Sequence, residues 1–287
     1  MPTALVTDST AYLPEDLVTG ADVRVVPLHV VVGGREHREG VDIDVARVAE
    51  ALRGFVPVST SRPAPAAFLE QYEAAARAGA DEVVSVHLSA ELSSTVGGAE
   101  LAAAAAPVPV TVVDSRALGM VMGHAVLAGA RAAATGAGAT EVADLVRRTC
   151  EGATVVFYVD TLEYLRRGGR IGRAGALLGS ALAIKPILGL QDGLIVPLER
   201  VRTASRAIGR IEDLAVEAAE RAVDAGAGVD VAVHHLDSAE RARGLRERLT
   251  ARLGTGVEVR VVELGAVVGA HVGPGTLAVA VVPRVAG

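Results

Sequence analysis

Aromatic residues are scarce in this chain. They make up 2% of its 287 residues, with no Trp, three Phe and four Tyr. Proteins that bind single-stranded nucleic acid stack the bases on aromatic rings, so the composition argues against that class. The net charge of −6 also leaves no global basic field that would attract nucleic acid or an anionic membrane. The core must be built from Ala, Val, Leu and Ile instead.

Cysteine is almost absent as well, because Cys150 is the only one. A single cysteine excludes an internal disulfide and a cysteine-based zinc cluster. His234 and His235 are adjacent, so on a strand they face opposite sides and cannot share a metal ion. We therefore expect neither a metal site nor a cofactor.

Long apolar runs are missing too. Pro107, Pro109, Gly179 and Lys185 interrupt the most apolar stretches, and none approaches the ~18–20 residues that a membrane-spanning helix needs. The N-terminus shows no basic segment followed by a long apolar run, which is the pattern of a signal peptide. We expect a cytoplasmic protein with no integral membrane segment.

What the chain does contain is enough apolar residues for a core, with 51% hydrophobic and 22% charged residues. Through the first half, short apolar segments alternate with helical patterns, joined by short connections. This alternation predicts a mostly parallel sheet flanked by helices. The expected strands are 3–7, 23–32, 82–88 and 110–113, and the expected helices are 42–52, 65–78, one ending near 106 and two within 118–150, broken near 136–138.

Polar residues follow three of these strands, namely Asp8-Ser9-Thr10, Ser89 and Asp114-Ser115. Open α/β sheets bind ligands at the carboxyl ends of their parallel strands. A ligand site is therefore expected near that edge of the sheet.

The pattern changes near residue 150. Residues 184–190 and 193–199 read as a hairpin, because Asp192-Gly193 favours a tight turn. We predict an α/β fold in two domains: an N-terminal α/β domain, 1–152, and a smaller C-terminal α+β domain, 153–287. Further expected elements are strands at 153–160, 229–235, 257–263 and 277–282, and helices at 160–167, 173–183, 203–225 and 238–252.

Two hydroxyl clusters, Thr60-Ser61-Arg62-Pro63 and Leu92-Ser93-Ser94-Thr95, precede expected helices. Such hydroxyls can bind an anion, helped by the free N–H groups and the positive dipole end of the helix. They can also be N-caps, with Thr60 and Ser93 accepting hydrogen bonds from the first turn. The two roles are compatible, and the sequence leaves both open.

His271 lies in a segment, 269–275, that is punctuated by glycines and Pro274. Such a loop lets the backbone approach a ligand closely, and the alternative is a turn with an incidental surface histidine. A hydrolase would draw on Ser93 and His271, with Asp8, Ser9 or Asp114 as partners. No Gly-x-Ser-x-Gly elbow is present to support it.

The segment 168–175 is rich in glycine and arginine. It matches neither the dinucleotide-binding nor the Walker pattern. It is either a helix-ending turn with solvated arginines or a docking patch for a partner protein, since arginine is favoured at interfaces. The arginines concerned are Arg166, Arg167, Arg170, Arg173, Arg200, Arg202 and Arg206.

Four segments together resemble the DegV family of bacterial fatty-acid-binding proteins. They are VTDST at 6–10, VVDSRALGMVMG at 112–123, LEYLRRGGRIGRAGALLGSALAIKPIL at 162–188 and GAHVGPG at 269–275. Their order and spacing cover nearly the whole chain.

The resemblance implies a two-domain α/β fold that buries a long-chain fatty acid within or between its domains. It also implies a non-catalytic subunit that presents the carboxylate to a separate, ATP-using fatty-acid kinase, which forms an acyl-phosphate. No catalytic residue and no cofactor besides the bound fatty acid are implied. The implied carboxylate-binding residues are Thr60, Ser93 and His271, with Ser61, Ser94, Thr95 and Arg62 as further candidates, and the implied partner-docking residues are Arg170, Arg173 and Arg202.

The chain departs from the family pattern at both hydroxyl clusters. A stretch resembling TSQPS is TSRPA here, which introduces Arg62 and Ala64, and LSGTYQS is LSSTVGG, which introduces Ser94 and Val96. These changes bear on the head-group geometry and the chain preference. Besides the acyl carrier, a hydrolase and a lipid-responsive regulator or storage protein in the same fold stay open.

Overall fold

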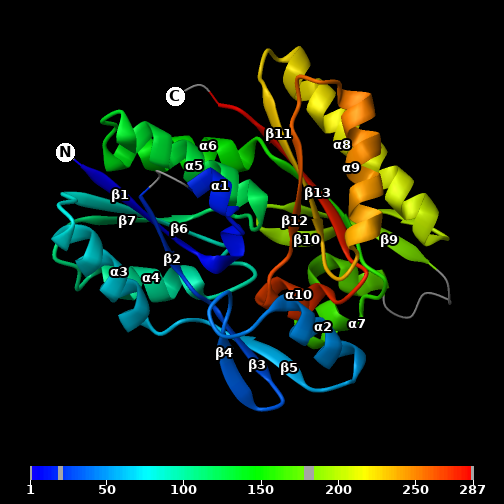
Figure 1. Ribbon diagram of the computed structural model, residues 1–287, viewed down its shortest axis with the longest axis horizontal. Helices are drawn as coiled ribbons and strands as arrows, with labels where there is room; N and C mark the ends of the chain where they lie inside the picture. Colours follow the sequence, from blue (N-terminus) through cyan, green and yellow to red (C-terminus); the bar gives the residue numbers. More distant parts are fainter. Residues whose placement is uncertain (1, 19–21, 178–183, 286–287) are drawn as a thin grey trace. The chain divides into compact units, whose positions relative to one another are not determined.

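The computed structural model describes residues 2–18, 22–177 and 184–285 (Figure 1). Within these ranges, no helix combines the length and the apolar character needed to cross a bilayer.

The chain forms two compact units, and the segment Val30–Thr60 decides how they divide. Unit 1 comprises Met1–His29, Ser61–Gly152 and Val285–Gly287, and unit 2 comprises Val30–Thr60 and Ala153–Arg284. This division differs from the expected domains, which placed residues 30–60 in the N-terminal one. Those residues belong to unit 2 because their contacts are with its distant elements, and unit 2 is the larger unit as a result.

The sheet of unit 1 is fully parallel, with the strand order β2-β1-β6-β7. Its strands are β1 (Thr3–Asp8), β2 (Val23–Val26), β6 (Glu82–His87) and β7 (Val110–Asp114). The expected strand at 23–32 is interrupted at Pro27-Leu28, as proline's missing N–H would dictate. The parallel order confirms the expected fold class of this half of the chain.

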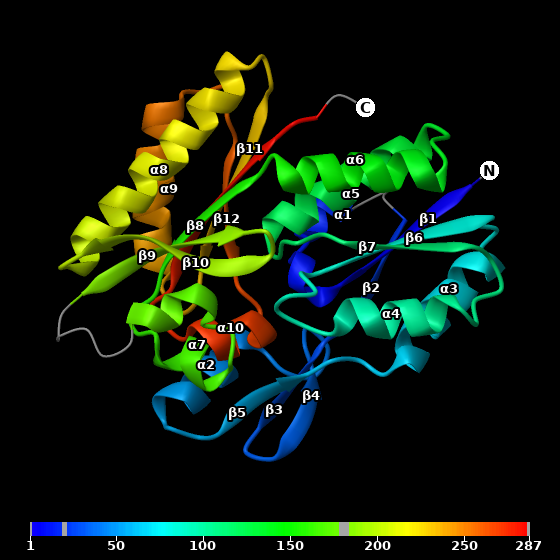
Figure 2. The same cartoon turned by 180° about the vertical axis from the view of Figure 1, so that it is seen from behind.

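Helices cover both faces of this sheet, with α3 and α4 on one face and α5 and α6 on the other (Figures 1 and 2). α3 starts at Pro65, where proline's missing N–H costs nothing. Gly136, with φ of 99°, separates α5 from α6 as the sequence predicts. The helical elements are η1 (Ser9–Ala11), α1 (Glu15–Val18), α3 (Pro65–Arg77), α4 (Thr95–Ala103), α5 (Met120–Ala134) and α6 (Ala139–Glu151).

Unit 2 contains a mixed six-stranded sheet in the order β10-β9-β8-β13-β11-β12, where only β11 and β12 run parallel. Asp192 and Gly193 both have positive φ, 50° and 80°, so the predicted tight hairpin turn is confirmed. The strands are β8 (Thr154–Tyr158), β9 (Lys185–Gln191), β10 (Leu194–Val201), β11 (Val229–His235), β12 (Val259–Glu263) and β13 (Leu277–Pro283).

The two long helices α8 (Ala204–Asp224) and α9 (Ala239–Leu253) lie side by side on this sheet (Figure 2). Their apolar faces bury much of the core of unit 2, including Ile211, Leu245 and Leu249. Both helices match the expected positions within two residues.

Short elements complete unit 2. A three-stranded sheet has the order β4-β3-β5, and the 3-10 helix η2 covers part of the expected helix at 173–183, of which residues 178–183 lie outside the described residues. These elements are β3 (His29–Val32), β4 (Arg35–Arg38), α2 (Val45–Arg53), β5 (Val58–Ser61), α7 (Glu163–Arg167), η2 (Gly172–Leu177) and α10 (Ala266–Val272).

Candidate functional site

A hydrogen bond joins two of the residues that the sequence singles out. The Thr60 hydroxyl Oγ1 lies 2.8 Å from Nε2 of His271. Thr60 comes from β5 and His271 from α10, and both side chains are half-buried. The structure therefore brings together residues that are 211 positions apart.

Neither residue has the local setting that the sequence suggested. Thr60 lies in a strand, and the N-cap of the following helix α3 is Ala64, which makes no side-chain cap. The N-cap interpretation of Thr60 is therefore wrong. His271 lies in the last turn of a short helix rather than in a loop. The hydroxyl of Thr60 thus has no capping role, and its hydrogen bond is to an imidazole.

The position of His271 depends on how α10 is held. The buried carboxylate of Glu39 accepts a hydrogen bond from the Val267 N–H, 2.8 Å away, in the first turn of α10. A negative charge there also complements the helix dipole. At the other end, a Cβ at Gly168 would overlap Nδ1 of His271, so only glycine lets α7 and α10 pack this closely.

The imidazole of His271 is neutral near pH 7. Burial, reinforced by the positive charge of Arg170, lowers the pKa of His271 to about 4. Its Nδ1 is buried and has no hydrogen-bond partner among the described residues. A buried N–H without a partner costs more than an unpaired acceptor, so we assign the proton to Nε2. Nε2–H then donates to Thr60, which leaves the threonine O–H available as a donor to a ligand.

A second hydroxyl pair lies at the start of α4 in unit 1. Ser93 Oγ is 2.8 Å from Thr95 Oγ1. The N-cap of α4 is Ser94, which makes no side-chain cap, so the N-cap interpretation of Ser93 is wrong as well. Because Ser93 belongs to unit 1 and Thr60 and His271 to unit 2, the expectation that the three share one ligand stays a prediction.

The other head-group candidates differ in exposure. Arg62 and Ser94 are exposed, Thr95 is fully buried and Ser61 is half-buried at the end of β5. Arg62 has no ion-pair partner in the part of the chain that the structure describes.

The three docking candidates fall into two groups. Arg170 donates to the Gly168 carbonyl at 2.6 Å and acts electrostatically on His271, so it lies beside the Thr60–His271 pair. Arg173 in η2 and Arg202 just after β10 are exposed, and neither has an ion-pair partner within the described ranges. η2 packs against β10, so these two come from neighbouring elements. By contrast, Arg166 and Arg167 bind Glu163.

Two residues suggested as partners for a hydrolase, Asp8 and Ser9, form other contacts. Asp8 binds His87, with 3.1 Å between Oδ2 and Nδ1, and both side chains are fully buried. Ser9 accepts a hydrogen bond from the Leu28 N–H. No local pattern indicates the Asp8–His87 pair, because 79 positions separate the two residues.

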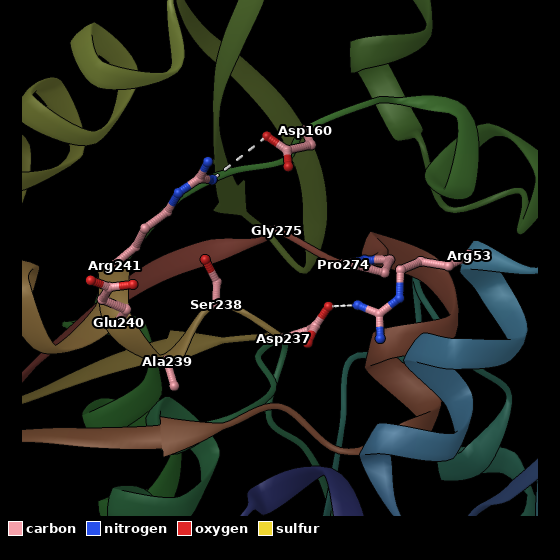
Figure 3. A pocket seen from close by; sticks show the side chains of 9 residues that line it. All are labelled: Arg53, Asp160, Asp237, Ser238, Ala239, Glu240, Arg241, Pro274 and Gly275. Carbon is pink, nitrogen blue, oxygen red and sulfur yellow. Dashed lines mark hydrogen bonds and ion pairs between the residues drawn. The ribbon is translucent and has the colours of Figure 1, made fainter.

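A cavity of about 410 Å³ lies in unit 2, where β8 and β11 end and α9 begins. Figure 3 shows Arg241 reaching toward Asp160 and Arg53 toward Asp237 on opposite sides of it. Charged and polar side chains dominate its lining, which does not suit an alkyl chain. This cavity is therefore not the expected tunnel for a fatty-acid tail.

Comparisons with known proteins extend over the whole chain. Residues 2–284 match the family described as "Uncharacterised protein, DegV family". A DegV domain-containing protein of Streptomyces coelicolor is 50% identical over 98% of each chain. One from Deinococcus radiodurans is 38% identical over 99% of each.

Solved structures agree with these relatives. A DegV family protein from Thermus thermophilus, described by its fatty-acid binding, has a TM-score of 0.90 and 36% identity, with 99% of this chain and 100% of that one covered. DegV from Bacillus subtilis, described as a fatty acid binding protein, has a TM-score of 0.89 and 31% identity, with 99% of each chain covered. These matches confirm the fold class, and the chain belongs to the DegV family.

Proposed function

We propose that this chain binds a long-chain fatty acid and holds its carboxylate with the hydroxyls of Thr60 and Ser93. The Thr60–His271 hydrogen bond carries the proposal. It fixes a hydroxyl that has no capping role, and a neutral imidazole supports it without adding charge. The fatty-acid binding of the Thermus thermophilus and Bacillus subtilis relatives supports the same ligand class.

The two parts of the ligand contribute differently to binding. Burying the ~14 methylenes of a 16-carbon tail contributes up to about 11 kcal/mol to the binding free energy. The loss of association entropy offsets several kcal/mol of that contribution. Hydrogen bonds to a charged group are worth roughly 1.5–3 kcal/mol each and mainly offset the cost of burying the carboxylate. The tail therefore supplies most of the affinity, while Thr60 and Ser93 fix the orientation of the head group.

The proposed role ends with presentation of the carboxylate to a separate fatty-acid kinase subunit, which transfers phosphate from ATP to form an acyl-phosphate. The chain itself contributes no phosphate-binding motif. The exposed Arg173 and Arg202 suit the docking of such a partner, and Arg170 lies closer to the head group. In this proposal the protein is cytoplasmic and non-catalytic, and the fatty acid is its only ligand.

Denaturing mass spectrometry of the purified protein tests the proposal. We expect a co-purified fatty acid, or uptake of added palmitate or oleate. Thr60→Val and Ser93→Ala remove one hydroxyl each and should weaken binding about tenfold with little loss of stability. Ser205→Ala, at an exposed position of α8, is the control. A wild-type protein that takes up no fatty acid would refute the proposal.

A further inference from the structure

The carboxylate of Asp8 is enclosed in the core of unit 1. Asp8 ends β1 and is 0% exposed. Its Oδ1 accepts hydrogen bonds from the N–H and the hydroxyl of Thr10, at 3.0 and 2.5 Å. Its Oδ2 accepts from the Leu88 N–H at 3.0 Å and from His87 Nδ1 at 3.1 Å. Each oxygen therefore accepts two hydrogen bonds, and the four donors hold the carboxylate in one orientation.

A chain of buried side chains extends from His87 away from Asp8. Because a carboxylate only accepts, Nδ1 of His87 carries the proton that faces Asp8. Nε2 is 2.7 Å from the Ser85 hydroxyl, and the Tyr72 hydroxyl donates to Ser85 at 2.9 Å. Burial raises the pKa of Tyr72 to about 12, so it stays a donor. The ring of Phe68 packs edge-on against the imidazole of His87. This network fixes the His87 ring and, with it, the end of β6.

From the end of β6, backbone hydrogen bonds lead to Ser93. The Leu88 N–H is held by Asp8 itself. The next residue, Ser89, is fully buried, and its carbonyl accepts hydrogen bonds from the N–H groups of Leu92 and Ser93, each at 3.0 Å. The segment from Leu88 to Ser93 is therefore attached at its start to the Asp8 carboxylate and at its end to Ser89.

We propose that Asp8 is the positioning residue for Ser93: by holding the N–H of Leu88 and the ring of His87, it fixes the turn that places the Ser93 hydroxyl for the fatty-acid carboxylate. This inference rests on the proposed function, because it assigns Asp8 a role through Ser93. Asp8 does not touch the ligand in this account. If Asp8 had only a structural role, it would stabilise unit 1 to the same extent, but its substitution would leave the affinity for fatty acid unchanged.

Glu82 offers a matched control at the opposite end of the same strand. It begins β6, whereas His87 ends it. Its Oε1 accepts a hydrogen bond from the Thr3 hydroxyl at 2.9 Å and from the Ala139 N–H at 2.6 Å. Glu82 thus ties β6 to its neighbours with the same chemistry as Asp8, but away from Ser93.

The experiment compares Asp8→Asn with Glu82→Gln in the full-length protein. An asparagine at position 8 replaces one acceptor oxygen with an NH2 group, so two of the four donors lose their partner whichever way the amide turns. We expect Asp8→Asn to melt earlier and to bind palmitate about tenfold more weakly. Glu82→Gln can keep a carbonyl oxygen in the place of Oε1, which accepts both hydrogen bonds, so it should bind palmitate as the wild type does. Wild-type affinity in Asp8→Asn, or an equal loss in Glu82→Gln, would overturn the inference.

A double-mutant cycle tests whether Asp8 acts through Ser93. If it does, adding Asp8→Asn to Ser93→Ala causes no further loss of affinity. Amide hydrogen exchange gives a second readout, because the N–H groups of Leu88 and Ser93 should exchange faster in Asp8→Asn while remaining protected in Glu82→Gln. If the two losses of affinity multiply in the double mutant, Asp8 acts independently of Ser93.

Two substitutions of His87 keep the test decisive if Asp8→Asn does not fold. The side-chain nitrogen of asparagine occupies the position of Nδ1, so His87→Asn keeps the donor to Asp8. The side-chain nitrogen of glutamine occupies the position of Nε2, so His87→Gln loses the donor to Asp8. We expect His87→Asn to retain affinity and His87→Gln to lose about tenfold. The reverse order would contradict the inference.

The outcomes separate this inference from the proposed function. If the wild-type protein binds no fatty acid, the proposed function fails, and the role of Asp8 in it fails too. If the wild type binds and Ser93→Ala weakens binding while Asp8→Asn does not, the proposed function stands and only the inference fails.

Discussion

At the scale of single residues, the charge state of His271 decides what the Thr60 hydroxyl can do. A protonated imidazole would have to place a second N–H, on Nδ1, in a buried position without an acceptor. Burial and the neighbouring Arg170 both oppose that charge, which is why the pKa of His271 falls to about 4. The neutral ring leaves the threonine hydroxyl free to donate to an anion.

This pKa makes folding stability depend on pH. Between the ordinary histidine pKa of about 6.5 and the folded value of about 4, the unfolded chain binds more protons than the folded one. The contribution of His271 is therefore constant above pH 6.5 and falls as the pH drops toward 4. From about pH 7 to about pH 5 the loss should be about 2 kcal/mol.

Urea unfolding of the wild type and of His271→Gln measures this effect. Glutamine can donate to Thr60 from a similar position but does not titrate. We expect the stability of the variant to change less than that of the wild type over this interval, by the same ~2 kcal/mol. Identical pH dependences of the two proteins would contradict the shifted pKa.

Local patterns single out Thr60 and His271 separately, and only the family resemblance links them to one site. Thr60 and His271 are separated by 211 positions, and no local pattern couples them. Composition and spacing left both N-caps and anion sites open, and the structure rules out the caps. The Asp8–His87 pair could not be predicted either, because a hydrogen bond between distant residues does not change the local periodicity of the sequence.

At the scale of elements, the packing of α7 against α10 controls the position of His271. α7 ends at Gly168, whose φ of −73° any residue could adopt. This position therefore requires glycine only for steric reasons, because a Cβ would overlap the His271 ring. Gly273, after α10, is likewise pressed against the ring of Tyr164. Gly168 and Gly273 thus mark close approach between two short helices.

Gly168→Ala should displace His271 without straining the backbone of α7. We expect loss of the Thr60–His271 hydrogen bond and about tenfold weaker binding of palmitate. The control is Gly209→Ala in α8, where a Cβ meets open space and the helix should gain about 0.5–1 kcal/mol. Calorimetric titration of both variants measures the affinities, and equal binding by the two would argue against the packing requirement.

Most long elements could be predicted from sequence because their signals are local. The Asp192-Gly193 hairpin, the break between α5 and α6 and the extent of α8 all follow from turn chemistry or apolar periodicity. The seven-residue α10 could not, because it is too short for a clear period and is held by Glu39 from a distant part of the chain. Nor could β4, which carries four polar or charged residues.

At the scale of the whole molecule, the exposed arginines that have no ion-pair partner among the described residues are the features best suited to the proposed docking of a kinase subunit. Such charges steer association and affect its rate more than they affect folding. Arg202 follows β10 and is exposed, so its removal should leave the fold and the proposed fatty-acid site unchanged.

Arg202→Ala should therefore bind palmitate as the wild type does, while acyl-phosphate formation with the kinase subunit falls about tenfold at low salt. Arg246→Ala, an exposed arginine on α9, serves as the control for loss of one positive charge. Steady-state phosphorylation over a range of kinase concentrations measures the effect. Unchanged rates for Arg202→Ala would remove this residue from the docking surface.

The segment Val30–Thr60 is synthesised long before the residues that it contacts in unit 2. Glu39 meets Val267 and Thr60 meets His271 only across 228 and 211 residues of chain. At roughly 5–20 residues per second, a ribosome needs on the order of 10–40 s to supply those partners. Until then β3, β4 and β5 have no completed unit to pack against, so nascent chains should expose them to chaperones. The Thr60–His271 hydrogen bond should be among the last contacts to form.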